Sequence, residues 1–204
     1  MLNESGGENM LEKEKIQKYF KKNNNYITTK DIVNLGIDKK NIPKMIEEGI
    51  IKKVCHGIYM NVDTLEDIYY IIQLRYPDAV FSYNTAFHIL NMTNVTPSTI
   101  DVTTLRKKQI IGNYNKHYVK DETYELGIII IDSPFGNPIR VYNAERSICD
   151  MLKSKNEFDL ELQNRILNNY FNSKNKNIKL LEQYAKKLNV YDKVNTIVEV
   201  MMKW

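Results

Sequence analysis

The chain has 204 residues, with 29 Lys and Arg against 25 Asp and Glu and a formal net charge of +4. Hydrophobic residues make up 43% and charged residues 26% of the sequence, which excludes a disordered or fibrous protein and suits one large or two small domains. No apolar run reaches the about 18 residues of a transmembrane helix. The start, MLNESGGENM, lacks the basic and apolar regions of a secretory signal. We therefore expect a cytoplasmic protein without membrane contact, with residues 1–10 as a flexible tail.

The next residues predict a cluster of short helices. Apolar side chains at helical spacing predict a first helix over Leu11–Lys22. Thr28, with Asp31 three residues later, is a capping-box-like start for a second helix, and Gly36 supplies the left-handed residue that ends it.

A third helix follows Asp38, which is a good N-cap, and runs to about Glu48 before Gly49. Pro43 has no backbone N–H and is tolerated only near the first turn. We therefore place the true start of this helix near Lys40 or Asn41.

After Gly49 the period changes from helical to strand-like. Residues 50–55 and 58–60 are rich in apolar residues, and His56-Gly57 between them is a hairpin-turn signal. Three short helices followed by a two-stranded ribbon predict a winged helix-turn-helix, a DNA-reading motif, over residues 11–62.

Residues 63–204 predict a separate domain with mixed patterns, so the fold class is α+β with a helical run at the C-terminal end. The β-branched and aromatic content of four segments favours strands, and Phe135–Pro138 is a turn between the last two. The expected helices are 65–75, 82–90, 143–154, 157–172, 176–188 and 190–203, and the expected strands are 100–104, 116–119, 128–131 and 139–142.

Basic and hydroxyl side chains recur on the elements that face DNA in a winged helix. The third helix would enter the major groove, while the wing and the start of the second helix would contact phosphate. Asn41 could read adenine and a lysine could reach guanine. A solvated surface is the alternative explanation for such a set. The candidate DNA contacts are Thr28, Thr29, Lys30, Lys39, Lys40, Asn41, Lys44, Lys52, Lys53 and His56.

The sequence gives no catalytic, metal or cofactor motif. Neither Cys55 nor Cys149 has a second Cys or His at zinc-ligand spacing, and glycine-rich phosphate loops are absent. His117 lies in an expected strand with no partner visible in the sequence, and His88 suits a half-buried core position.

Glu145, Arg146 and Asp150 raise the question of an enzyme. Arg146 and Asp150 are four residues apart and can pair on a helix, whereas Glu145 and Asp150 diverge. We favour an ion pair that ties a helix start to the core. A phosphate or metal pocket lined by Glu145, Asp150 or Asp132 would instead favour a nucleic-acid-modifying enzyme.

Several segments together resemble the AbiEi-type antitoxins of bacterial abortive-infection toxin–antitoxin systems. The first is the helix–glycine–basic strand pattern that ends in Gly57-Ile58-Tyr59. Three others lie in the second half of the chain: FSYNTA from Phe81, TPSTIDVT from Thr96 and GNPIRVYNAERSICD from Gly136. In the last, Ser147 stands where the family has Thr.

This resemblance implies a non-enzymatic antitoxin of a type IV system. Its winged helix would bind inverted repeats in its own promoter, as double-stranded DNA, and repress transcription. Its second domain would oppose a nucleotidyltransferase-like toxin functionally, without a stable complex in this family. The resemblance is compatible with a dimer or with cooperative binding on DNA. The signature residues, structural or functional, are Ser82, Thr85, Asp101, Glu145, Arg146 and Asp150. The alternative function is a stand-alone regulator whose second domain senses a ligand.

Overall fold

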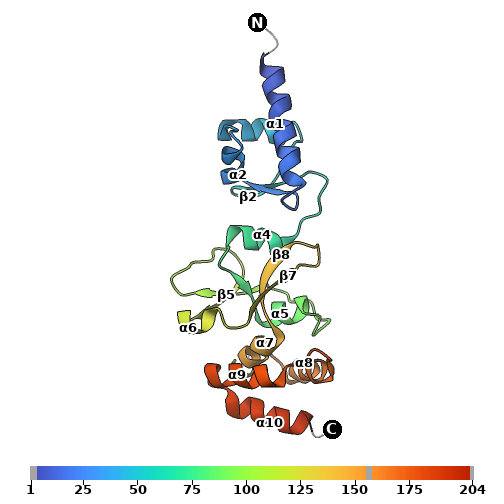
Figure 1. Cartoon of the computed structure of the whole chain (residues 1–204), viewed down its shortest axis with the longest axis vertical. Coiled ribbons are helices and arrows are strands. Elements are labelled where there is room, and N and C mark those ends of the chain that lie inside the picture. The colour runs from blue at the N-terminus through green and yellow to red at the C-terminus, as the bar shows by residue number, and fades with distance from the viewer. Residues whose placement is uncertain (1–3, 155–157, 203–204) are drawn as a thin grey trace. The chain divides into compact units, whose positions relative to one another are not determined.

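The computed structural model describes residues 4–154 and 158–202 (Figure 1). The chain divides into two compact units, residues 1–75 and residues 76–204, which are described separately. Both contain helices and strands, so the predicted α+β class is confirmed. The division falls after Arg75, which assigns the helix expected over residues 65–75 to the first unit. Within the described residues, the helices lack the length and apolar character needed to cross a lipid bilayer.

The first unit has a helix–strand–helix–helix–ribbon order with an antiparallel sheet in the order β1-β3-β2. Gly57, at φ +75°, forms the turn between β2 and β3, a backbone conformation that glycine adopts without steric cost. We call this ribbon and its turn the wing. This is the arrangement predicted from the sequence, with β1 as an additional strand. The elements are α1 (Glu4–Phe20), β1 (Tyr26–Thr28), α2 (Thr29–Asn34), the 3₁₀ turn η1 (Lys39–Asn41), α3 (Ile42–Glu47), β2 (Lys52–Cys55), β3 (Ile58–Met60) and α4 (Ile68–Arg75).

The sheet of the first unit is covered on both faces. Neighbouring residues of a strand point to opposite faces, and Tyr59 and Met60 of β3 do so here. Tyr59 packs in a cluster with Ile16 of α1 and Met45 of α3, whereas Met60 packs in another with Ile71 of α4. Helices α1, α2 and α3 thus cover one face, and α4 packs on the other.

Three local signals in the sequence are confirmed, although α3 begins at Ile42 and not at the expected Lys40 or Asn41. Asp31 N donates to Thr28 Oγ1 at 3.2 Å and Thr28 N donates to Asp31 Oδ2 at 3.0 Å, which confirms the capping box of α2. Gly36 is in the left-handed region at φ +74°. Pro43 lies in the first turn of α3, as its missing N–H requires.

The start of α4 differs from the prediction. The helix begins at Ile68 and not at Leu65. The physical reason is a cap that the sequence analysis overlooked: Asp67 Oδ1 accepts from Tyr69 N at 3.0 Å and from Tyr70 N at 3.2 Å. An aspartate in this role satisfies N–H groups that a helix start leaves without partners.

The second unit contains a mixed five-stranded sheet in the order β6-β5-β4-β8-β7. The central strand β4 pairs antiparallel with β5 and parallel with β8, and β7 and β8 form the expected antiparallel hairpin. The sequence analysis missed β4 and α6, which are only two and four residues long. The elements are β4 (Val80–Phe81), α5 (Tyr83–Ile89), β5 (Asp101–Leu105), β6 (Asn115–Val119), α6 (Asp121–Tyr124), β7 (Ile128–Asp132), β8 (Pro138–Tyr142), α7 (Ala144–Lys153), α8 (Leu160–Asn172), α9 (Ile178–Leu188) and α10 (Tyr191–Met201).

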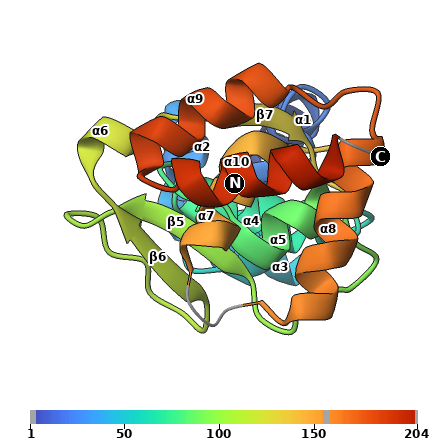
Figure 2. The same ribbon diagram turned by 90° about the horizontal axis from the view of Figure 1, so that it is seen from below.

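The C-terminal helices α7–α10 of the second unit gather together (Figure 2). Their apolar side chains form one buried cluster that also includes Phe87 of α5. A second cluster, around Val80, Tyr124 and Tyr142, joins β4, α6 and β8. The expected helical run at the C-terminal end is therefore present, and it supplies most of the core of this unit.

Three predictions extend into residues outside the described part of the chain. The prediction of a flexible tail over residues 1–10 is wrong for residues 4–10, because helix α1 begins at Glu4; residues 1–3 are not described. The helices expected over 157–172 and 190–203 correspond to α8 and α10, with residues 157 and 203 outside the described residues.

Candidate nucleic-acid interface

The helical segment Lys39–Glu47 carries exposed lysines. Ile42 and Met45 are buried in the core of the first unit, with exposed fractions of 6% and 1%, so the opposite side of the segment faces solvent. Lys40 and Lys44 are four residues apart and lie on that side, and Lys39 is also exposed. Lys44 Nζ is 3.8 Å from Glu48 Oε1, a solvent-exposed pair that holds the ammonium only weakly.

The start of α2 lies against the wing. Thr29 N donates to Gly57 O at 2.9 Å, and Thr29 Oγ1 is 3.6 Å from the position of a Cβ at Gly57. The structure therefore brings Thr29, and the exposed Lys30 after it, to the turn that carries the exposed His56. Lys53 of β2 is exposed as well.

Three of the predicted contacts are already bonded within the protein. Thr28 forms the capping box described above, and its Oγ1 also donates to Asp31 Oδ2 at 2.6 Å. Asn41 is half-buried, and its Nδ2 donates to Glu12 Oε1 on α1 at 2.9 Å.

Lys52 is the third. Its Nζ is 2.6 Å from Glu66 Oε1, and it stands opposite Met60 in the β2–β3 ladder, on the α4 side of the sheet. Sequence reasoning missed Glu12 and Glu66 because these partners are 29 and 14 residues away from the lysine or asparagine that they bind.

The comparison with known families bears on this same unit. Residues 14–62 match the model of a family described as transcriptional regulator, AbiEi antitoxin. The resemblance inferred from the sequence is thereby confirmed for this segment. The match runs from within α1 to Val62, two residues after the end of β3, and supports a role as a transcriptional regulator and antitoxin. No curated protein matches the chain.

The AbiEi-like signature residues of the second unit lie outside the matched segment, and all six are buried. Thr103 Oγ1 donates to Ser82 Oγ at 2.8 Å, and Asp101 N donates to Thr85 Oγ1 at 2.8 Å. These bonds tie the start of α5 to β5. Ser82, Thr85 and Asp101 therefore each stabilise the contact between these two elements.

Asp101 also corrects the expectation for His117. Its Oδ1 is 3.0 Å from His117 Nε2, so this histidine has a carboxylate partner that the sequence did not indicate. The His117 ring stacks on Tyr83, with centroids 3.8 Å apart. The partners are adjacent because β5 and β6 run parallel and side by side, with Thr103 opposite His117.

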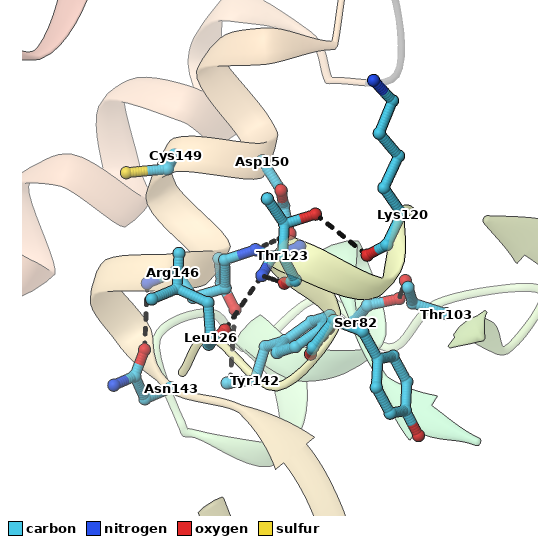
Figure 3. Close-up of polar contacts among 12 residues, drawn as sticks. Ser82, Thr103, Lys120, Thr123, Leu126, Tyr142, Asn143, Arg146, Cys149 and Asp150 are labelled. Carbon is cyan, nitrogen blue, oxygen red and sulfur yellow. Dashed lines mark hydrogen bonds and ion pairs between the residues drawn. The ribbon is translucent and has the colours of Figure 1, made fainter. Parts of the chain in front are cut away.

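The signature residue Arg146 of α7 bonds to several neighbouring groups (Figure 3). Its side chain is 0% exposed, and its Nε donates to Asp150 Oδ2 at 2.9 Å, which confirms the predicted pair. Its Nη1 donates to the carbonyl oxygens of Thr123 and Leu126, and the guanidinium lies 4.2 Å from the ring centroid of Tyr142. Arg146 thus fastens α7 to the α6 turn and to β8.

The carboxylates considered for an enzyme do not form one site. Burial raises the pKa of the Asp150 carboxyl, and the Arg146 guanidinium acts in the opposite direction. Glu145 Oε1 accepts from Tyr170 OH at 3.0 Å and lines a cavity of about 410 Å³. Asp132 lines a different cavity, of about 880 Å³. Among the described residues, no group of three or more His, Cys, Asp or Glu is placed to hold a metal ion.

Proposed function

We propose that the chain is the antitoxin and transcriptional autorepressor of a type IV toxin–antitoxin operon, acting in the bacterial cytoplasm. The observation that carries the proposal is the exposed trio Lys39, Lys40 and Lys44 on the η1–α3 segment, inside the AbiEi-matched residues. A helix of this size fits the major groove of B-DNA, where its lysines reach phosphates and base edges.

The wing and the start of α2 would add phosphate contacts beside that helix. Lys30 and His56 are exposed neighbours in sequence of Thr29 and Gly57, which are joined by a hydrogen bond, and Lys53 on β2 is exposed too. Such contacts fix the position of a protein on the duplex and carry most of the salt dependence of binding. Thr28 and Asn41 would act indirectly, because their side chains hold α2 and the start of α3 in place.

The second unit would carry the antitoxin function against a nucleotidyltransferase-like toxin. The burial of its signature residues supports a structural role for them. Surface residues of this unit would therefore counteract the toxin. The promoter sites would be inverted repeats, with one copy of the chain on each half.

A promoter–reporter assay tests the repressor proposal. The full chain is expected to repress a reporter fused to the DNA upstream of its own gene, and the triple variant Lys39→Ala, Lys40→Ala, Lys44→Ala is expected to lose repression. The matched control is Lys18→Ala, Lys21→Ala, Lys22→Ala, which removes the same charge from exposed positions at the end of α1. Equal repression by both variants, at equal protein levels, would contradict the proposal.

Growth rescue tests the antitoxin function separately. Co-expression of the full chain with the adjacent gene is expected to restore growth that the adjacent gene alone stops. The lysine triple variant is expected to rescue as well as the wild type, since it changes only the first unit. A chain that represses its promoter but never restores growth would be a regulator and not an antitoxin.

A further inference from the structure

The second unit holds a cavity of about 880 Å³ whose lining includes none of the proposed DNA contacts. It lies between the end of α5, the loop that follows, the end of β7 and α8, and the polar side chains that line it include Asn94, Asp132, Arg165 and Asn169. Pockets for small molecules have volumes of about 300–1,000 Å³. The cavity is therefore large enough for a compact organic ligand.

Hydrogen bonds between α8 and the loop after α5 hold the wall of this cavity in place. Arg165 Nη1 donates to Asn94 Oδ1 at 3.1 Å, and Asn169 Nδ2 donates to Met92 O at 2.9 Å. Arg165 and Asn169 are four residues apart and lie on the same side of α8. A wall that is ordered before the ligand arrives lowers the entropy cost of binding.

The same bonds decide what the two amides present to a ligand. The oxygen of Asn94 is bonded to Arg165, so Asn94 offers its NH₂ group as a donor. The nitrogen of Asn169 is bonded to the Met92 carbonyl, so Asn169 offers its oxygen as an acceptor. A donor and an acceptor on one wall match the edge of a nucleobase, which carries both kinds of group.

The charges of the cavity argue against a phosphate. Arg165 Nη2 is 2.8 Å from Glu161 Oε1 in an exposed ion pair, so a carboxylate of the protein competes with an anionic ligand for its guanidinium. Asp132 adds a negative charge at the end of β7. A carboxylate accepts hydrogen bonds from ribose hydroxyls, as in dinucleotide-binding folds, and repels a phosphate group.

The geometry points to a nucleoside-binding site in the second unit, with the base on Asn94 and Asn169 and the ribose on Asp132. The ligand class is an uncharged ribonucleoside, not its phosphate. This site is separate from the DNA interface, and its test does not depend on promoter binding.

Ligand-observed NMR and thermal unfolding of the full chain with the four common ribonucleosides at millimolar concentration test this site. At least one is expected to bind and to raise the midpoint of unfolding, and its 5′-monophosphate is expected to bind about tenfold more weakly, as one repelled charge implies. Asp132→Asn is expected to weaken binding about tenfold, since it removes a charged hydrogen-bond partner.

Asn169→Ala is expected to weaken binding similarly, with Asn168→Ala as the matched control. Asn168 is the neighbouring residue on α8, is exposed and does not line the cavity. Because Asn169 also bonds to Met92, the exposed Asp132→Asn variant keeps the test valid if Asn169→Ala fails to fold. Failure of all four ribonucleosides to bind the folded chain would overturn the inference. So would equal or tighter binding of the monophosphate, or wild-type affinity in Asp132→Asn.

Discussion

The substitution Arg146→Met keeps a long side chain at a fully buried position and removes the guanidinium. It breaks the 2.9 Å pair with Asp150, the donors to the carbonyl oxygens of Thr123 and Leu126, and the contact with the Tyr142 ring. Removing one partner of a buried pair costs about 3–5 kcal/mol, and each carbonyl left without a donor costs about 1–3 kcal/mol. Since a domain is stable by about 5–15 kcal/mol in total, we expect most of the second unit to unfold.

Urea denaturation followed by circular dichroism, with hydrogen exchange of individual amides, measures this effect. The amides of the second unit should lose protection, while those of the first unit keep theirs. The double variant Arg146→Met, Asp150→Leu should recover part of the lost free energy of unfolding, because it no longer buries an unpaired carboxyl group. A single variant within about 1 kcal/mol of the wild type would refute the assigned role of Arg146.

Three further predictions concern local features. Gly127→Ala should destabilise the chain by about 2–4 kcal/mol in thermal unfolding, because φ is +82° and the new Cβ would lie 2.6 Å from Arg146 Cβ. The control Gly136→Ala has the same φ but no atom within 4 Å of the new Cβ, so it should cost only about 1–2 kcal/mol. Burial raises the pKa of the Cys149 thiol from 9.0 to about 12, so the unfolded chain loses this proton first and the free energy of unfolding falls as pH rises from about 9 to about 12. In urea titrations across this pH range, the free energy of unfolding of Cys149→Ala should fall less steeply than that of the wild type, by about 1.4 kcal/mol per pH unit. The same slope in both proteins would rule out the assignment. Thr28→Val should lower the free energy of unfolding by about 1–2 kcal/mol by removing the α2 cap, whereas Thr28→Ser should stay close to the wild type.

The sequence predicts best those features whose cause lies within one helical turn. The partners in the capping box of Thr28 and Asp31 and in the Arg146–Asp150 pair are at most four residues apart. The place of Pro43 in the first turn of α3 is likewise a local effect of its missing N–H. Backbone geometry alone brings such residues together. The wing turn at Gly57 belongs to the same group.

Features that depend on distant partners were missed or left open. Strand β1 is three residues long and exists because it pairs with β3, with Tyr26 opposite Met60. The Asp101–His117 contact needs two parallel strands, and the Asn41–Glu12 bond needs α1 packed beside α3. The hydrophobic periodicity of the sequence does not indicate these partners. For the same reason, the sequence proposes the lysines and Asn41 as equal candidates, whereas the structure shows that Asn41 and Lys52 already have partners within the protein.

The most direct test of the proposed DNA interface is the salt dependence of binding to the promoter fragment, measured by fluorescence anisotropy. For B-DNA, each phosphate contact contributes about 0.9 to the slope of log K against log salt concentration. If Lys39, Lys40 and Lys44 each contact phosphate, replacing all three with alanine should reduce the slope by about 2.7, and the control triple Lys18→Ala, Lys21→Ala, Lys22→Ala should keep the wild-type slope. A wild-type slope in the first triple variant, or an equal reduction in the control, would contradict the assignment of this helix to the DNA.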